Sequence, residues 1–194
     1  MTARDLARKL RAVDLEPPFE AAEYRTDRLL LRPHRLEDAA EWVQLQSHAS
    51  VREFLSWPER TETESVAHLK KRTGQTTLHV ADDFLALAVE LDGQLIGDVS
   101  MHLRAARATV RSVEAGWVIS PEWSGRGFAT EAARELLRIA FDEIGAVVVF
   151  AVVHEDNIAS RQLSERLGFT LASQQGRDLS YSLTRAAWSA LPGV

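Results

Sequence analysis

A glycine loop between a strand-like run and an amphipathic helix constrains this chain more than any other segment. Residues 112–119 are strand-like, a proline turn follows, and the loop Gly125-Arg126-Gly127 opens an amphipathic run that reaches Phe141. The first backbone N–H groups of a helix lack internal partners, and the helix dipole adds partial positive charge there. The segment therefore predicts a site for a phosphate-bearing ligand.

The common nucleotide-binding motifs do not describe this loop. The pattern G-x-x-x-x-G-K-[ST] does not occur in the chain, and G-x-G-x-x-G would need glycine where Thr130 stands. A lone pair of glycines can also simply form a turn. The strand before the loop, the helix after it and a second matching motif later in the chain favour ligand binding.

Composition narrows the remaining classes. The chain has 194 residues, which suits one domain, and its net charge of −5 argues against a nucleic-acid surface while it fits a cationic acceptor. The absence of cysteine excludes disulfides, thiolate metal sites and a cysteine nucleophile. No histidine pair has metal-ligand spacing, so we expect no metal. No apolar run approaches the ~18 residues of a membrane span. The charged N-terminus lacks a signal core, which predicts a cytoplasmic protein.

Residues 1–24 are expected to be an N-terminal extension, and residues 25–194 the domain proper. Leu6, Leu10 and Val13 have helical spacing, so residues 3–14 predict a short helix packed on the domain or on a partner, with disorder as the alternative. Because that apolar stripe suits burial against a second copy, a homodimer is a further expectation.

Periodicity predicts an α/β (α+β) fold in the order β-α-α-β-β-β-α-β-α-β-β, with one mixed sheet and helices on both faces. Asp92-Gly93 predicts a tight hairpin turn. The apolar run 147–153 suits a strand buried on both faces. We expect strands over 28–32, 84–91, 94–103, 110–119, 147–153, 169–173 and 179–184, and helices over 36–47, 62–72, 125–143 and 157–167.

Short strings in a fixed order carry a family resemblance over nearly all of the chain after residue 25. They are Thr26-Asp27-Arg28-Leu29-Leu30-Leu31-Arg32, Ser56-Trp57-Pro58, Leu95-Ile96-Gly97, Gly116-Trp117-Val118-Ile119-Ser120-Pro121, Gly125-Arg126-Gly127-Phe128-Ala129-Thr130-Glu131-Ala132, Asn157-Ile158-Ala159-Ser160, Leu167-Gly168-Phe169 and Trp188. In their order and spacing the chain resembles the GCN5-related N-acetyltransferases (GNAT), and within them the RimJ/RimL type that acetylates ribosomal-protein N-termini.

The resemblance implies acetyl-CoA as donor, a primary amine as acceptor, and a GNAT fold. It implies that loop N–H groups hold the CoA pyrophosphate, that the preceding strand pairs with the pantetheine amides, and that an N–H near Val118 polarises the thioester carbonyl. The implied cofactor-binding residues are Val118, Ile119, Ser120, Ser124, Gly125, Arg126, Gly127, Phe128, Ala129, Thr130 and Asn157.

Two of these positions have a second interpretation, and one neighbouring residue departs from the family pattern. Arg126 contacts the phosphates or is simply solvated. Asn157 contacts the pantetheine arm or the adenine side, or it caps the next helix, and both roles are compatible. Glu122 stands where the family usually has Gln or Arg, so we expect it to point away and leave binding to the backbone.

Amine acetylation needs a base for the ammonium and a proton for the departing thiolate. The resemblance implies Ser160 as proton donor, with Ser164 one helical turn further as the other candidate. The alternative for Ser160 is an ordinary helix-surface serine.

The base is not fixed by the resemblance. Glu114 shares a strand face with Gly116 and Val118, but it could instead pair with Arg104, Arg107 or Arg111. Asp178, His102 and His154 are further candidates, of which Asp178 and His102 could contact the acceptor. Trp57 could form an aromatic wall for the acceptor or pack between two helices.

The sequence thus predicts a cytoplasmic N-acetyltransferase (an acyltransferase) that moves acetyl from acetyl-CoA to a protein N-terminus or a small cationic amine. Attack is expected to be direct, through a tetrahedral intermediate. The alternative is a non-catalytic acyl-CoA-binding regulatory module that kept the loop and lost the base. Neither nucleic acid nor membrane is an expected partner.

Overall fold

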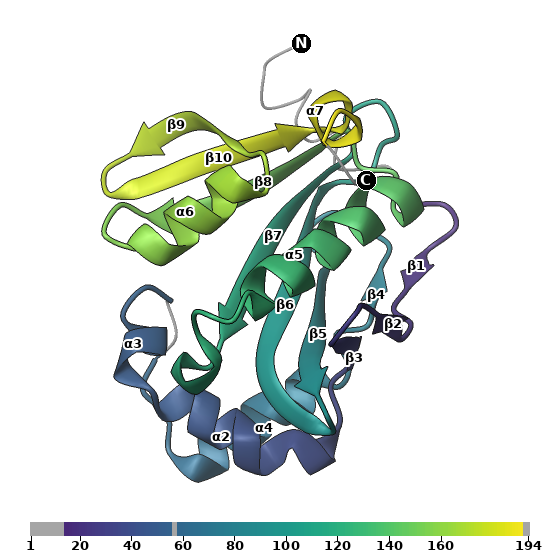
Figure 1. Ribbon diagram of the computed structural model, residues 1–194. Helices are drawn as coiled ribbons and strands as arrows, with labels where there is room; N and C mark the ends of the chain where they lie inside the picture. Colours follow the sequence, from purple (N-terminus) through teal and green to yellow (C-terminus); the bar gives the residue numbers. More distant parts are fainter. Residues whose placement is uncertain (1–13, 56–57, 192–194) are drawn as a thin grey trace.

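The computed structural model describes residues 14–55 and 58–191, which form one curved eight-stranded sheet with helices on both faces (Figure 1). The strand order is β2-β3-β5-β6-β7-β8-β10-β9, and the neighbours are antiparallel except for the parallel pair β7 and β8. A separate two-stranded sheet pairs β1 with β4.

The strands and helices of the described residues have the following bounds. The strands are β1 (Phe19–Glu20), β2 (Tyr24–Arg25), β3 (Leu30–Pro33), β4 (Thr77–Leu78), β5 (Phe84–Leu91), β6 (Gln94–Ala105), β7 (Ser112–Ile119), β8 (Val148–His154), β9 (Thr170–Gln175) and β10 (Asp178–Thr184). The helices are α2 (Ala39–Ser47), α3 (Ala49–Arg52), α4 (Glu62–Arg72), α5 (Phe128–Arg138), α6 (Ile158–Arg166) and α7 (Arg185–Ser189), with short 3-10 or π turns at Leu36–Asp38, Pro121–Trp123 and Ile139–Glu143.

Two apolar clusters explain why the central strands are buried. One face of α5 packs on the sheet through Phe128, Ala132 and Leu136, which recur at helical spacing. On the opposite face, Trp42 of α2 and Leu69 of α4 pack in a second cluster. The predicted mixed sheet with helices on both faces is confirmed. No helix within the described ranges is long and apolar enough to cross a membrane.

Several expected elements differ from the structure in their bounds or their burial. The first strand of the domain begins at Leu30 rather than residue 28. The central helix begins at Phe128, because the glycines before it adopt loop conformations, and it ends in a π turn after Arg138. The prediction that β8 is buried on both faces is wrong, because burial alternates along the strand and Val152 is 49% exposed.

The hairpin prediction is confirmed, since Asp92 and Gly93 both have positive φ between β5 and β6. Part of the expected N-terminal extension packs on the domain, where Leu15 is buried and Tyr24 begins a strand of the large sheet. The expected helix over 3–14 and the predicted acceptor wall at Trp57 fall outside the described residues, except for residue 14 of that helix.

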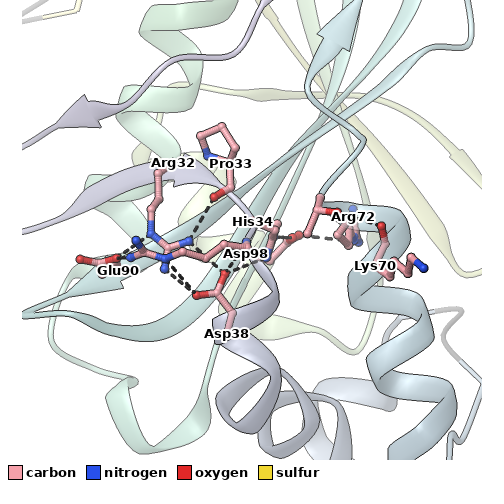
Figure 2. Close-up of polar contacts among 10 residues, drawn as sticks. Arg32, Pro33, His34, Asp38, Lys70, Arg72, Glu90 and Asp98 are labelled. Atoms are coloured by element: carbon pink, nitrogen blue, oxygen red, sulfur yellow. Dashed lines mark hydrogen bonds and ion pairs between the residues drawn. The ribbon is translucent and has the colours of Figure 1, made fainter.

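A buried ion-pair network fastens the α2–α4 layer to the sheet (Figure 2). Arg32 of β3 donates to Asp38 at 2.6 and 2.9 Å and to Glu90 of β5 at 2.6 Å. His34 lies 2.8 Å from Asp98 of β6. Buried charges are tolerated only when they are paired and hydrogen-bonded. The network therefore fixes the helix layer at a defined place beside β3, β5 and β6.

Candidate functional site

The strands β7 and β8 separate at the centre of the sheet. Their parallel pairing covers only Ser112 to Glu114 of β7 and ends at Phe150 of β8, although β7 continues to Ile119 and β8 to His154 (Figure 1). Past the last pair, one edge of each strand has no strand neighbour among the described residues. Unpaired strand edges present backbone N–H and C=O groups that an extended ligand can bind.

A cavity of about 830 Å³ lies at this gap and joins four segments of the chain. The segments are the α3 region, the end of β7, the glycine loop with the start of α5, and α6 with its N-cap Asn157. Its lining includes Ser50, Val51, Phe54, Leu55, Trp117, Val118, Ile119, Ser124, Gly125, Gly127, Phe128, Ala129, Thr130, Asn157, Ala159, Ser160, Leu163 and Arg166.

The glycine loop presents a row of free backbone donors to this cavity. Within the described chain, the N–H groups of residues 125–130 have no hydrogen-bond partner, and the first donor of α5 with a backbone acceptor is Glu131. Gly125 and Gly127 have φ of 76° and 82°, which glycine adopts without strain. Such successive N–H groups at a helix N-terminus bind phosphate. The loop fits a pyrophosphate group.

Two side chains of the loop have partners elsewhere. Glu122 accepts a hydrogen bond from Gln44 of α2 at 2.8 Å, so its carboxylate points toward the helix layer, as expected. The Arg126 guanidinium lies 4.9 Å from the centre of the Trp123 ring, and Arg126 is not among the lining residues. The Ser124 N–H is also unavailable, because it donates to the Pro121 carbonyl. Of Arg126 and Ser124, which were both expected to bind the cofactor, only Ser124 lines the cavity.

The register of β7 changes which N–H group can face the thioester. Ser120 donates to the Ile96 carbonyl of β6 at 2.8 Å, and antiparallel strands direct alternate residues to opposite edges. Val118 therefore points its backbone toward β6, as Ser120 does. Trp117 and Ile119 point theirs toward the open edge. The expectations of a Val118 N–H at the thioester and of Ser120 in the site do not fit this register.

Asn157 and Ser160 lie together at the start of α6, and both line the cavity. The Asn157 side chain accepts from the Ser160 N–H at 3.0 Å, so the capping role is present. The Ser160 hydroxyl accepts a long hydrogen bond of 3.4 Å from the indole N–H of Trp117. Ser164 is fully buried and donates to the Ser160 carbonyl at 2.9 Å, so its hydroxyl is committed to the helix rather than to the cavity.

The expected base Glu114 is held away from the cavity. Its carboxylate accepts from Arg104 at 2.7 and 3.0 Å, which is the alternative that cross-strand pairing allowed. His102 lies opposite Glu114 in the register and contacts the Asp82 carbonyl and the Phe84 ring. Neither Glu114 nor His102 lines the cavity. The structure therefore does not bring these two residues to the site.

Asp178 is exposed at the start of β10, opposite His154 at the end of β8. The His154 ring lies beside the Phe54 ring, with ring centres 5.7 Å apart, and Phe54 lines the cavity. His154 thus contacts a residue of the lining but is not itself part of it. The α3 region that carries Phe54 was not anticipated, because a four-residue helix has too few residues for a periodic signal.

Comparisons with known proteins agree with this geometry. The sequence model described as "Acetyltransferase (GNAT) domain" matches residues 28–170. The chain is 27% identical over 143 residues to the uncharacterized N-acetyltransferase YnaD of Bacillus subtilis, covering 74% of this chain and 79% of YnaD. It is 28% identical over 145 residues to the spermidine N(1)-acetyltransferase of Escherichia coli K12, covering 74% of each.

A solved GNAT-family acetyltransferase from Bacillus anthracis has the same fold, with a TM-score of 0.73 at 20% identity over 85% of this chain and 99% of that one. The fold, the open edge between β7 and β8 and the family match together place the chain. It belongs to the GNAT family of N-acetyltransferases, which take their acetyl group from acetyl-CoA.

Proposed function

We propose that this protein transfers acetyl from acetyl-CoA to an acceptor that carries one primary amino group, such as a protein N-terminus. The amine attacks directly, without a covalent enzyme intermediate. One observation carries the proposal: a single cavity joins the row of free N–H groups at residues 125–130, the open edge of β7 and the Ser160 hydroxyl. These are the parts that a phosphate, an extended amide chain and a leaving thiolate require.

On the donor side, the N–H groups of residues 125–130 hold the pyrophosphate. The backbone groups of Trp117 and Ile119 bind the pantetheine amides at the open edge of β7, and one N–H of this edge polarises the thioester carbonyl. Ser160 stands at the far side of the same cavity, on the first turn of α6.

The amine nitrogen attacks the thioester carbon and gives a tetrahedral intermediate. Its C–S bond then breaks, the departing thiolate takes a proton from the Ser160 hydroxyl, and the new amide nitrogen releases its second proton to solvent. The Ser160 oxygen regains a proton from solvent. The ammonium loses its proton before attack, either to water or to His154, which contacts Phe54 of the cavity lining. Separate donor and base sites fit a direct transfer.

The charge of the lining favours a single-amine acceptor. Among the described lining residues there is no carboxylate, and the only charged side chain is Arg166. A second ammonium, as in a polyamine, would need a nearby anion. The motifs of the RimJ/RimL type and the absence of an acidic lining support a protein N-terminus. The likeness to a spermidine acetyltransferase supports the other candidate acceptor, a small cationic amine.

A second function also has a specific observation behind it. No Asp, Glu or His stands among the described lining residues, as expected for a regulatory module that binds acyl-CoA but has lost its base. The two functions differ in turnover. Release of free thiol from acetyl-CoA, measured across a panel of peptides and small amines, separates them. Acetyl-CoA binding without thiol release from any acceptor would favour the module.

Ser160→Ala tests the assignment of the proton donor. We expect kcat to fall about a hundredfold while the acetyl-CoA dissociation constant stays near that of the wild type, because only the departing thiolate needs the hydroxyl. Ser164→Ala is the matched control on the same helix, and we expect it to lower stability but keep kcat. An unchanged kcat in Ser160→Ala at every pH would refute the role of Ser160.

A further inference from the structure

The residues just before β3 contact the first turn of α5, beside the glycine loop. The carboxylate of Glu131 receives the Thr26 hydroxyl at 2.5 Å and the Arg28 backbone N–H at 2.8 Å on one oxygen. Its other oxygen receives Nε and Nη2 of Arg28 at 2.7 and 2.6 Å. Paired N–H donors on one carboxylate form one of the stronger and more directional contacts in proteins. The motif Thr26-Asp27-Arg28 is thereby fastened to the helix start.

The same arginine also contacts the loop itself. Nη1 of Arg28 donates to the Arg126 carbonyl at 3.0 Å, and the guanidinium lies 4.4 Å from the centre of the Phe128 ring. A Cβ placed on Gly127 would lie 3.4 Å from Nη2. Arg28 therefore contacts Arg126 and Phe128, and its guanidinium lies close to Gly127 between them. A carbonyl held in this way cannot turn toward the anion, so the neighbouring N–H groups keep their direction.

Charge gives the contact a second effect. Burial acts to raise the pKa of Glu131, but hydrogen bonds from Thr26 and Arg28 hold that pKa below its usual range. The carboxylate is therefore ionised at neutral pH, in the first turn of a helix that is to bind a pyrophosphate. An unpaired carboxylate there would repel the ligand. The Arg28 guanidinium cancels that charge at 2.6 Å.

We propose that Arg28 is a positioning residue for acetyl-CoA: it fixes the loop carbonyl at Arg126 and neutralises Glu131, so that the N–H groups of residues 125–130 stay directed at the pyrophosphate. The proposal rests on the proposed function, in which this loop holds acetyl-CoA. It gives a role to an arginine that lies just before β3 and is distant in sequence from the loop.

The test compares three variants of the full chain. Arg28→Met removes the charge and the donors but keeps the apolar stem, and Arg28→Lys keeps the charge but loses the fork that reaches both Glu131 and Arg126. Arg138→Met is the matched control, because Arg138 pairs with Glu135 at 2.7 Å on the same helix, with a side chain 39% exposed against 46% for Arg28. Acetyl-CoA binding is measured by isothermal titration calorimetry, and loop order by amide hydrogen exchange without ligand.

We expect Arg28→Met to weaken acetyl-CoA binding about tenfold, Arg28→Lys to weaken it less, and Arg138→Met to leave it unchanged. Amides of residues 125–130 are expected to exchange faster in Arg28→Met than in the wild type. The acetyl-CoA KM should rise, whereas kcat at saturating acetyl-CoA should stay the same, a split that a general loss of folding would not give.

The proposal is overturned if the wild type binds acetyl-CoA and Arg28→Met binds it equally well with unchanged loop exchange. If Arg28→Met fails to fold, Arg28→Lys decides, and wild-type affinity in that variant overturns the proposal. A wild type that does not bind acetyl-CoA at all contradicts the proposed function instead.

Discussion

Gly97 of β6 shows how a missing side chain shapes the donor site. A Cβ at this position would lie 2.3 Å from the Val118 carbonyl oxygen and 2.6 Å from the Ile119 side chain. Real Cβ atoms do not approach so closely, so the strand that borders the cavity must move if position 97 carries any side chain. Glycine here permits a close approach of two strands rather than an unusual turn.

We therefore predict that Gly97→Ala lowers the free energy of unfolding by about 1–3 kcal/mol and also weakens acetyl-CoA binding, because the end of β7 is displaced. Gly74→Ala is the matched control, since its Cβ would meet only the Lys71 carbonyl at an ordinary 3.7 Å. Urea unfolding and calorimetric titration measure the two effects. Wild-type stability and affinity in Gly97→Ala would show that β7 does not depend on this contact.

Glu114 shows where sequence reasoning stops at the level of single residues. The strand face of Glu114 was predictable from alternation, but which arginine lies beside it depends on the register with β6. The bond to Arg104 could not be predicted from the sequence, because a shift of one residue in the register between β6 and β7 would give Glu114 another partner. In contrast, the prediction of free N–H groups at the glycine loop needs only the local chain, since every helix start has them.

At the level of elements, the attachment of the α2–α4 layer depends on a few buried charges. Asp38 lies at the start of α2, and its carboxylate receives two bonds from Arg32 and one from the Arg35 backbone N–H. Burial acts to raise the pKa of Asp38, but these hydrogen bonds hold that pKa below its usual range. Removal of the carboxylate would leave the buried Arg32 with Glu90 as its main partner.

Asp38→Asn is accordingly expected to lower the free energy of unfolding by about 3 kcal/mol at pH 7, near the cost of breaking a buried ion pair. The depressed pKa means that this stabilisation is present above the unfolded pKa of about 4 and is lost as pH falls through the lower folded value. Urea unfolding at pH 7 and pH 3 checks both points. The difference between wild type and variant should shrink at pH 3, and a constant difference would contradict the ionised role.

Element boundaries were predictable where the period was clear, as for α4 and β5, whose bounds agree with the sequence prediction. They were not predictable where tertiary contacts decide. The apolar run of β8 is the same on both faces, yet only one face is covered by a helix, which nothing in the run itself reveals. The place of Phe54 at the cavity was likewise not predictable, because this residue lies in the turn after the four-residue helix α3, which is too short for a periodic signal.

At the scale of the whole molecule, the two helix layers contribute different parts of the candidate site. Helices α5 and α6 lie on one face of the sheet and helices α2 and α4 on the other (Figure 1). The first face carries the glycine loop and Ser160, the second carries the ion-pair network and α3, and the cavity lies between the ends of β7 and β8. A site assembled from both faces depends on the global fold. Conditions that unfold either layer are therefore expected to empty the cavity. In the α2–α4 layer, we expect acid to act through Asp38 and His68, whose pKa values are both lowered.

His68 of α4 provides part of that acid sensitivity. Burial, together with the positive charges of Arg60 and Arg72, lowers the pKa of His68 to about 4. Its ring lies beside Trp42 at 5.6 Å, and Nδ1 lies 2.7 Å from the Gln46 side-chain nitrogen, a contact that suits the neutral ring. An unfolded histidine has a pKa of about 6.5. Between these values the unfolded chain binds a proton that the folded chain does not.

The free energy of unfolding must therefore fall as pH decreases from about 6.5 to about 4, because protons favour the unfolded chain in that window. We expect about 1–2 kcal/mol from His68, less than the full pKa difference implies, since the side chain is only half buried and solvent screens it. His68→Gln should flatten the slope in that window and leave a constant difference from the wild type above pH 7. Urea unfolding at half-unit pH steps measures both slopes, and equal slopes between pH 4 and 6.5 would show that His68 takes its proton equally in both states.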